Sequence, residues 1–251
     1  MGNSPTDLSI VNLGCGTKAS SVGINIDFSI YLLLKKYRVD KLLPSSVIGK
    51  QRKINIAHLP ENIICHNLAK GIPLATNSAG AVYHSHLLEH IDKHQRQDFL
   101  REILRVLKPG GIHRICVPDL MGLVEQYRRT YSLASKNEIS AQEHEKSIEE
   151  LYEQSVRRES FGSSQQTGAR RWIENMVLGD ARKRGETHQW MYDQVNLSCA
   201  LKDAGFVDTK VKQFSRSEIA QWHKMGLEIG ADGEEYKKGS LYLECKKPSV
   251  S

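Results

Sequence analysis

Three histidines and a glutamate lie close together in the stretch 84–90, which reads HSHLLEH. Its last five residues have the pattern H-x-x-E-H, which in one class of zinc peptidase is the metal site itself. For that chemistry, His86 and His90 would have to share one face of a helix, with Glu89 as the base and a third ligand further along the chain. Residues 80–84, however, are typical of a buried strand. The pattern therefore predicts a strand-to-helix junction and no metal site.

A histidine at the end of a strand could instead act as a general base, because its pKa lies close to the working pH. His86 is the first candidate for this role and His84 the second, whereas His90 is interpreted as structural. A third candidate base, His188, lies in the later sequence THQWMYD. The alternative is that these histidines only satisfy backbone groups. Glu89 is expected to anchor a loop or cap the helix rather than take part in chemistry.

A glycine turn, NLGCGT, is the second stretch whose residue types suggest chemistry. Gly14 and Gly16 lack a Cβ, so their backbone could approach a ligand closely. Asp27 ends the next predicted strand, where its carboxylate could accept hydrogen bonds from both hydroxyl groups of a ribose. This combination favours a cofactor that contains a nucleoside. Only 13 residues separate Gly14 from Asp27, against roughly 20 in the dinucleotide fingerprint. The third glycine of that fingerprint is also missing, which argues against a nicotinamide or flavin dinucleotide.

Alternating strands and helices must position these residues. Apolar, β-branched runs predict the strands, and apolar side chains at helical spacing predict the helices. Strands are predicted over 8–13, 22–26, 62–66, 80–84, 112–117, 207–214 and 241–245, and helices over 95–107 and 197–204. The first helix is predicted to end at the breaker sequence KPGG, residues 108–111. The alternation predicts an α/β fold, a doubly wound, Rossmann-like and mostly parallel sheet.

Residues 121–184 differ from the rest of the chain because they are polar, rich in Glu, Gln and Arg, and poor in strand formers. They are predicted to form a helical insertion, a lid over the cofactor cleft, in a core domain made of residues 1–120 and 185–251. Residues 30–43 are a second candidate cover. The basic clusters at 157–158, 170–171 and 182–184 indicate either an anionic substrate or an ordinary solvated helix surface, since glutamates interleave with them.

The sequence resembles the class I S-adenosylmethionine-dependent methyltransferases in the segments VNLGCGT, VGINIDFS, ICHNLAKGIPL, AVYHSHLLEHI and FLREILRVLKPGGIHRICVPDL. It is similar in particular to a small bacterial branch found in saccharide and secondary-metabolite gene clusters, which GETHQWMYD and LKDAGFVDTKV also fit. The resemblance covers residues 8–120 and 185–247. It implies transfer of a methyl group from S-adenosylmethionine to a small biosynthetic substrate; we expect oxygen as the acceptor atom, and nitrogen stays open as the alternative.

The resemblance also implies roles for matching positions. Gly14 and Gly16 would pass beneath the methionine part of the cofactor. Asp27 would hold the ribose, while Asn67 and Leu68 would flank the adenine. The full expected set of cofactor-binding residues is Asn12, Gly14, Cys15, Gly16, Asp27, Asn67, Leu68, Ser85 and His86.

Three positions depart from the usual pattern of the family. Asn67, Asn12 and Gly80 stand where an acid is common. An amide at position 67 can still accept a hydrogen bond from the adenine amino group. Two alternatives stay open: an RNA- or protein-directed methyltransferase, and a catalytically silent binding protein.

The composition sets the remaining expectations. Of 251 residues, 39% are hydrophobic and 25% are charged, as in soluble globular proteins, and the net charge of +6 attracts anionic partners only weakly. Aromatic residues are sparse beside the basic clusters, which disfavours nucleic acid. Five scattered cysteines favour a reducing cytoplasm, and the sequence shows neither a secretion signal nor an apolar run of membrane length. We expect a cytoplasmic enzyme with a small-molecule substrate; the oligomeric state is left open.

Overall fold

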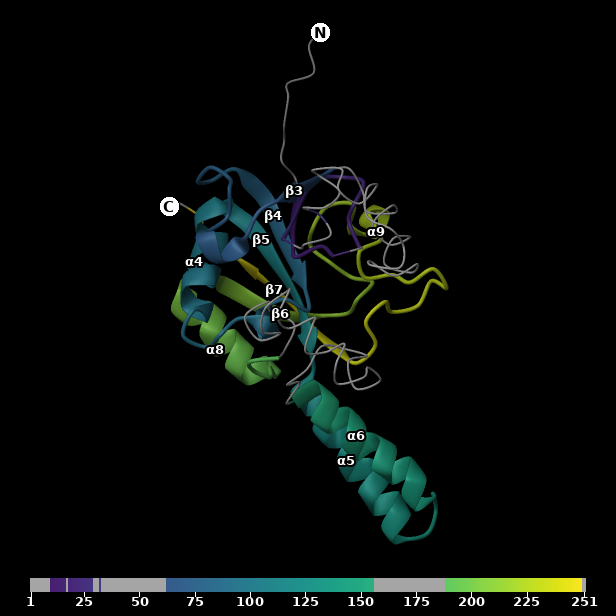
Figure 1. The fold of residues 1–251 in the computed structure, drawn as a ribbon. Coiled ribbons are helices and arrows are strands. Elements are labelled where there is room, and N and C mark those ends of the chain that lie inside the picture. The colour runs from purple at the N-terminus through teal and green to yellow at the C-terminus, as the bar shows by residue number, and fades with distance from the viewer. Residues whose placement is uncertain (1–9, 17, 29–31, 33–61, 156–187, 250–251) are drawn as a thin grey trace, which may run out of the picture.

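The computed structural model describes residues 10–16, 18–28, 32, 62–155 and 188–249. These residues form one seven-stranded sheet with helices packed on it (Figure 1). The strand order is β3-β2-β1-β4-β5-β7-β6, and the described strands pair in parallel except where β7 lies antiparallel between β5 and β6. The predicted doubly wound, mostly parallel sheet is therefore confirmed.

The strands are β1 (Ile10–Leu13), β2 (Ile24–Asp27), β3 (Ile63–Cys65), β4 (Ala79–Ser85), β5 (Leu107–Pro118), β6 (Val207–Lys212) and β7 (Ser240–Lys246). The α-helices are α4 (Arg96–Val106), α5 (Leu120–Ser135), α6 (Ala141–Ser155), α8 (Gln194–Ala204) and α9 (Trp222–Met225). Two single-turn 3-10 helices, η2 (Leu68–Lys70) and η3 (Leu88–His90), follow β3 and β4. All seven predicted strands are present, with bounds that differ by a few residues.

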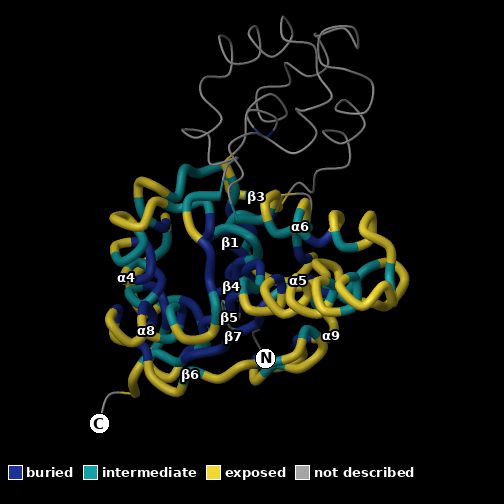
Figure 2. Tube along the Cα trace, turned by 90° about the horizontal axis from the view of Figure 1, so that it is seen from below, coloured by how far each residue is buried: buried dark blue, intermediate teal, exposed yellow. Residues whose placement is uncertain are grey.

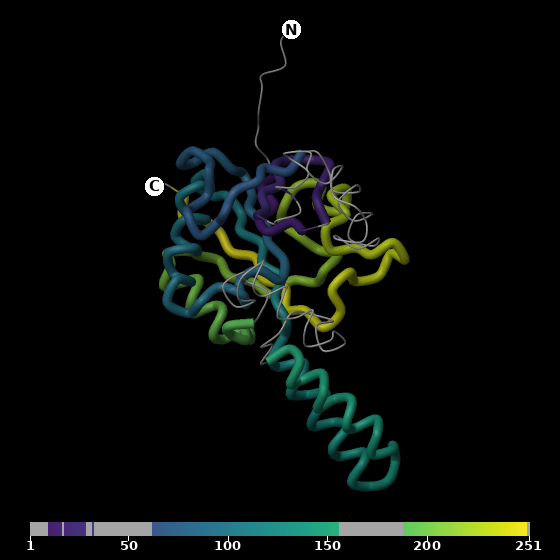
Figure 3. The backbone as a smooth tube through the Cα atoms, in the orientation of Figure 1, coloured from purple at the N-terminus to yellow at the C-terminus, as the bar shows by residue number. Residues whose placement is uncertain are grey.

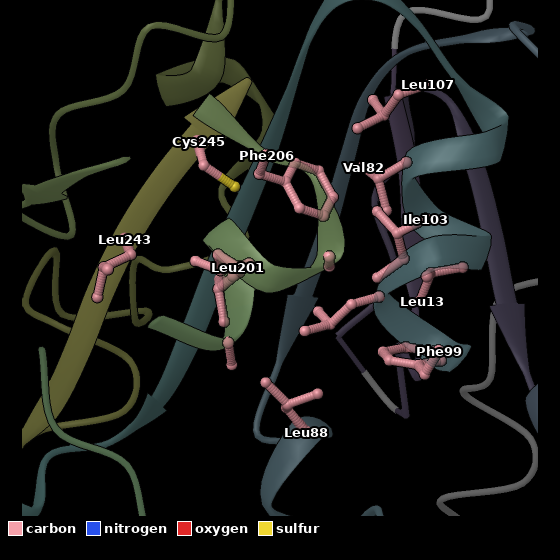
Figure 4. Close-up of a cluster of buried hydrophobic side chains, with 14 of the residues drawn as sticks. Leu13, Val82, Leu88, Phe99, Ile103, Leu107, Leu201, Phe206, Leu243 and Cys245 are labelled. Carbon is pink, nitrogen blue, oxygen red and sulfur yellow. The ribbon is translucent and has the colours of Figure 1, made fainter. Parts of the chain in front are cut away.

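The alternation of side chains along the strands divides the core into two layers. One layer holds Val82 of β4 and Leu243 of β7, which pack against α4 and α8 (Figure 4). The other holds Tyr83 and Tyr242, which pack against Trp222 of α9. In Figure 2 the buried strands occupy the centre, and exposed residues concentrate on the helices around them. The sheet is therefore covered on both faces, as parallel sheets require.

Helix α4 ends just before the KPGG segment, as predicted, but KPGG itself belongs to a strand. Helix α4 ends at Val106 because Leu107 is already extended and pairs with Ala79. Residues 108–111 belong to β5, and the register of the β4–β5 pair shifts beside them, between Ala79 and Ala81. Gly110 has a φ of +75°, which glycine adopts readily. The four residues thus follow the helix end and make a bulge at the start of a strand.

Helix α8 ends where the sequence predicts, before Gly205, but it begins at Gln194 rather than at Leu197. At its start, the Asp193 carboxylate accepts a hydrogen bond from the Asn196 N–H, and the Asn196 side chain accepts one from the Asp193 N–H. At its end, Gly205 has a φ of +102° and caps the helix in the left-handed conformation. These caps fix the position of the segment before α8, which contains His188.

Helices α5 and α6 form a hairpin that begins at the carboxyl end of β5 and extends away from the sheet (Figures 1 and 3). The Thr130 hydroxyl joins the two helices, because its oxygen lies 2.8 Å from the Ser147 hydroxyl and 3.0 Å from His144 Nδ1. The rest of the predicted insertion, including its three basic clusters, lies outside the described residues, as does all of 30–43 except Leu32. The lid therefore stays a prediction. No described helix has the length and apolarity needed to span a membrane.

Candidate functional site

A pocket of about 220 Å³ opens where β1 and β4 end side by side. The strand order changes direction between these two strands, so it is the place where ligands of open α/β sheets bind. Three parts of the chain meet there: the glycine turn, the end of β4 and a late loop before β7. The lining residues are Asn12, Gly14, Cys15, Gly16, Lys18, Tyr83, Ser85, His86, Leu227, Tyr236 and Lys237.

The two glycines of the turn serve different purposes. Gly14 and Gly16 have φ values of +63° and +52°, a region that other residues rarely adopt. A Cβ on Gly14 would lie 3.0 Å from the Leu87 side chain, so this glycine allows close packing within the protein. A Cβ on Gly16 would meet no atom within 4 Å, so the space beside this glycine is open to a ligand.

Asp27 lies beside the turn, at the end of β2. Its carboxylate accepts hydrogen bonds from the backbone N–H groups of Gly16 and Phe28. Burial raises the pKa of Asp27, while these two hydrogen bonds and one with the Cys15 thiol lower it. Burial and the charge of Asp27 raise the pKa of Cys15 to about 12, so the thiol stays protonated. A carboxylate offers about four acceptor positions, and these three hydrogen bonds leave one, so Asp27 can also accept a hydrogen bond from a ribose hydroxyl group.

Asn12 stabilises the glycine turn through side-chain hydrogen bonds. Its side-chain amide is buried and donates hydrogen bonds to Asn25 Oδ1 and to the Lys18 carbonyl oxygen, both at 3.1 Å. Asn25 in turn accepts a hydrogen bond from the Ser20 N–H. A carboxylate at position 12 could not donate either bond. The replacement of the usual acid by asparagine therefore fits this network, in which Asn12 positions the turn.

Asn67 and Leu68 follow β3, next to the end of β2. Cys65 pairs with Asp27, and the His66 N–H donates a hydrogen bond to the Asp27 carbonyl oxygen. Asn67 Oδ1 accepts a hydrogen bond from the Ala69 N–H at 3.0 Å and so caps η2, while Leu68 packs against the core. Neither residue is among those that line the pocket, so the expected contact with adenine stays a prediction.

His86 reaches the pocket because the backbone leaves the strand geometry at this residue. Its φ is +49°, and its N–H donates a hydrogen bond to the Cys116 carbonyl oxygen at 2.9 Å. Its Nε2 lies 2.9 Å from the Ser240 hydroxyl, which donates its own hydrogen to the Lys237 carbonyl oxygen. Nε2 therefore carries the ring hydrogen, and Nδ1, 3.4 Å from Glu89 Oε1, has the lone pair.

His84 does not lie in the pocket, contrary to its expected role as a base. Its side chain is fully buried in the layer under α4, beside Phe99 and His113. Burial lowers the pKa of His84 to about 3. The pleat of β4 explains this placement, because alternate residues point to opposite faces. Val82 and His84 face one layer, whereas Tyr83 and Ser85 face the pocket.

His188 is not among the residues that line the pocket. Its ring packs edge-on against that of His90, with 4.9 Å between the ring centroids, and its Nδ1 is 2.6 Å from the Gln154 carbonyl oxygen. Glu89 lies between His90 and His86, and it is fully buried. Burial raises the pKa of Glu89 to about 8. The structure thus brings His86 to the pocket and places His188 next to Glu89 and His90.

The late loop is the part of the site that the sequence did not predict. Lys18 donates a hydrogen bond to the Ile229 carbonyl oxygen at 2.8 Å, and its ammonium lies 4.6 Å from the centre of the Tyr236 ring. Tyr236 and Lys237 complete the pocket wall. Because these two residues are far along the chain from the glycine turn, no local sequence pattern could have predicted that they contribute to the site.

A buried arginine holds this loop against the sheet. The Arg114 guanidinium donates hydrogen bonds to both Glu228 oxygens and to Glu244 Oε1, and to backbone carbonyls of the segment Gln213–Arg216. Arg114, Glu228 and Glu244 are all almost fully buried. Because Glu228 follows Leu227, which lines the pocket, this ion network fixes the pocket wall to β5 and β7.

Comparisons with known proteins agree with this geometry. Residues 11–115 match the family model described as a methyltransferase domain. No curated protein matches the chain.

Several solved structures are similar to the chain. An S-adenosylmethionine-dependent methyltransferase of Thermotoga maritima is 16% identical, with a TM-score of 0.41, over 95% of this chain and 82% of that one. One from Archaeoglobus fulgidus is 13% identical, with a TM-score of 0.42 and coverage of 95% and 86%. One from Mesorhizobium loti is 15% identical, with a TM-score of 0.42 and coverage of 95% and 90%.

The fit of the site to the cofactor of this family rests on three features: the open space beside Gly16, the half-buried carboxylate of Asp27 and the pocket at the change of strand direction. Residues 11–115 are therefore a class I S-adenosylmethionine-dependent methyltransferase domain, and S-adenosylmethionine is its cofactor.

Proposed function

We propose that the protein methylates a hydroxyl oxygen of a small biosynthetic substrate, a saccharide or a secondary metabolite. The observation that carries this proposal is the position of His86, at the end of β4 and beside the glycine turn in the same pocket.

The cofactor supplies an activated methyl group whose carbon–sulfur bond breaks as the acceptor oxygen attacks the carbon. One carbon–oxygen bond forms, the bonding electron pair goes to sulfur, and the hydroxyl proton must leave. The protein therefore has to align the acceptor, exclude water and receive the proton.

His86 is the group that we propose to receive this proton. It is the one histidine among the described residues that line the pocket. The Ser240 hydroxyl lies 2.9 Å from its Nε2, and Glu89 Oε1 lies 3.4 Å from its Nδ1. His188, the other candidate from the sequence, packs against His90, does not line the pocket and is assigned a different role below.

Two lysines at the pocket support an anionic acceptor. Lys18 and Lys237 both line it, and their ammonium groups flank the Tyr236 ring at 4.6 and 5.8 Å. A carboxylate or phosphate on the acceptor would find charge-assisted hydrogen bonds there. The insertion 121–184 is proposed to select the acceptor, because α5 begins directly after β5, at the edge of the sheet where the pocket opens.

Incubation with S-adenosylmethionine carrying a labelled methyl group and a panel of sugar acids, sugar phosphates and hydroxylated aromatic acids tests this function. We expect label in a small product, seen by mass spectrometry, and a large loss of turnover in His86→Asn. Asparagine tolerates the left-handed backbone but cannot take the proton. His94→Ala, an exposed histidine outside the pocket, is the matched control. Label that enters only RNA or protein would overturn the proposal.

A further inference from the structure

We propose that Glu89, His90 and His188 bind a divalent transition-metal ion beside the methyl-transfer pocket. The three side chains come from two distant parts of the chain, yet one possible ligand atom of each lies within 4.8 Å of the others. Glu89 Oε1 is 4.0 Å from His90 Nε2, and the two imidazole rings pack edge-on.

The carboxylate of Glu89 lacks the partners that a buried acid requires. Its side chain is fully buried, and neither oxygen accepts a hydrogen bond within the described part of the chain. A buried polar group without a partner is costly, and a buried charge more so, unless it is paired or coordinates a metal. The nearest groups to Oε1 are nitrogens of His86 and His90, at 3.4 and 4.0 Å. A bound cation would satisfy this carboxylate.

The hydrogen bond of His188 prepares its ring for a metal. A carbonyl oxygen can only accept, so the bond of 2.6 Å between Nδ1 and the Gln154 oxygen places the ring hydrogen on Nδ1. In the neutral ring the lone pair is then on Nε2. Histidines that bind metals almost always donate their other ring N–H to a carbonyl or carboxylate in this way.

Backbone hydrogen bonds hold His188 at this position. The Gln189 and Trp190 N–H groups both donate to the Glu89 carbonyl oxygen, at 2.6 and 3.3 Å. The Lys93 ammonium also lies 4.2 Å from the centre of the Trp190 ring. The segment that starts at His188 is thus fastened to η3, the turn that carries Glu89 and His90.

The kinds of donor atom indicate the kind of ion. Two imidazole nitrogens and one carboxylate oxygen suit Zn²⁺, Co²⁺, Mn²⁺ or Fe²⁺, whereas Mg²⁺ and Ca²⁺ prefer oxygen. Zinc binds such ligands at about 2.0–2.2 Å, so the three side chains have to approach one another on binding. Three protein ligands leave at least one position open, which is typical of catalytic rather than structural zinc.

The ion would connect with methyl transfer through His86, which lines the pocket and contacts Glu89. A cation bound to Glu89 would change the contact between Glu89 and the His86 ring, and with it the capacity of His86 to take the acceptor proton. This consequence rests on the proposed function, but metal binding does not. The sequence pattern suggested His86 and His90 as ligands on one helix; the structure instead turns His86 towards Ser240 and brings in His188.

Zinc titration of the metal-free, tag-free full chain by calorimetry tests the site. We expect one zinc ion per chain, confirmed by elemental analysis after dialysis. Glu89→Gln and His188→Ala should each bind zinc at least about tenfold more weakly, the smallest loss expected even for a partner outside the first shell. Co²⁺ should give a visible absorption band in the wild type that both variants lose. His94→Ala should bind as the wild type does.

The proposal is overturned if the wild type binds no stoichiometric zinc, or if both variants, shown to be folded by circular dichroism, bind zinc as tightly as the wild type. Titration of the same samples with S-adenosylhomocysteine separates the two claims. Cofactor binding without zinc binding removes only the metal site. Zinc binding without cofactor binding or methyl transfer removes only the proposed function.

Discussion

The imidazole rings of His84 and His113 pack against each other inside the sheet domain, with 5.1 Å between their centroids. Both side chains are fully buried, and among the described residues neither ring has a hydrogen-bond partner. Burial lowers the pKa of His84 to about 3; burial, and then His84 itself, lowers that of His113 well below the usual value. The folded protein therefore keeps both rings neutral.

This pair should make the protein less stable in acid. Below a pH of about 6.5 the unfolded chain binds protons at both histidines and the folded chain does not. The free energy of unfolding therefore falls as the pH drops from about 6.5 towards 3, by up to about 1.4 kcal/mol per pH unit for each histidine. Urea unfolding of the wild type and of a His84→Leu, His113→Leu variant at pH 7.5, 5.5 and 4.5 measures the difference. Equal pH dependence in both proteins would contradict this prediction, and His94→Leu is the control.

Gly16→Ala should weaken cofactor binding while the protein still folds. The new Cβ meets open space, so its cost is that of one left-handed residue, about 1–2 kcal/mol. It would nevertheless occupy the space that a ligand approaches, and S-adenosylhomocysteine should bind much more weakly by calorimetry. Gly14→Ala should lower the melting temperature further, because its Cβ would press on Leu87. Unchanged affinity in Gly16→Ala would argue against the turn as cofactor site.

Asp27→Asn should weaken cofactor binding without unfolding the protein. Hydrogen bonds to a charged group contribute about 1.5–3 kcal/mol, so the dissociation constant for S-adenosylhomocysteine should rise by about ten- to a hundredfold. Asp98→Asn, in an exposed pair with Arg101, is the control and should bind normally. If the two variants bind equally well, Asp27 does not hold the ribose.

Arg114→Met should be the most destabilising of these substitutions. It would leave Glu228 and Glu244 buried without their cation, at a cost of about 3–5 kcal/mol. Adding Glu228→Gln and Glu244→Gln should recover part of that loss, because the uncompensated charges then disappear. Urea unfolding of both proteins measures the recovery, and a triple variant less stable than Arg114→Met would contradict this account.

Local patterns explain what the sequence could predict. The glycine turn and Asp27 were predictable because a turn and the two strands around it lie in one short stretch, and their residue types have direct geometric meanings. The strands were predictable because buried parallel strands are continuously apolar. The helix end before KPGG was predicted, but the place of KPGG in β5 was not, because lysine, proline and glycine suit both a helix end and a strand bulge.

The candidate site depends on features without a local signal. The sequence offers both His84 and His86 as bases. The pleat of β4 buries His84, whereas the left-handed backbone of His86 itself directs its side chain to the pocket. The pocket wall depends on Arg114 and Glu228, which lie 114 residues apart in the sequence. Similarly, nothing in the stretch HSHLLEH indicated that His188 would lie next to Glu89 and His90.

The place of β7 in the sheet has a consequence for how the chain assembles. Strand β6 has β7 as its one described neighbour, and β7 follows all the other strands in the sequence. During synthesis, β5 and β6 therefore keep open edges until β7 inserts between them. Such long-range pairing is slow, and open edges invite association with other chains. Correct closure of the sheet and protection from aggregation thus depend on the same seven-residue strand.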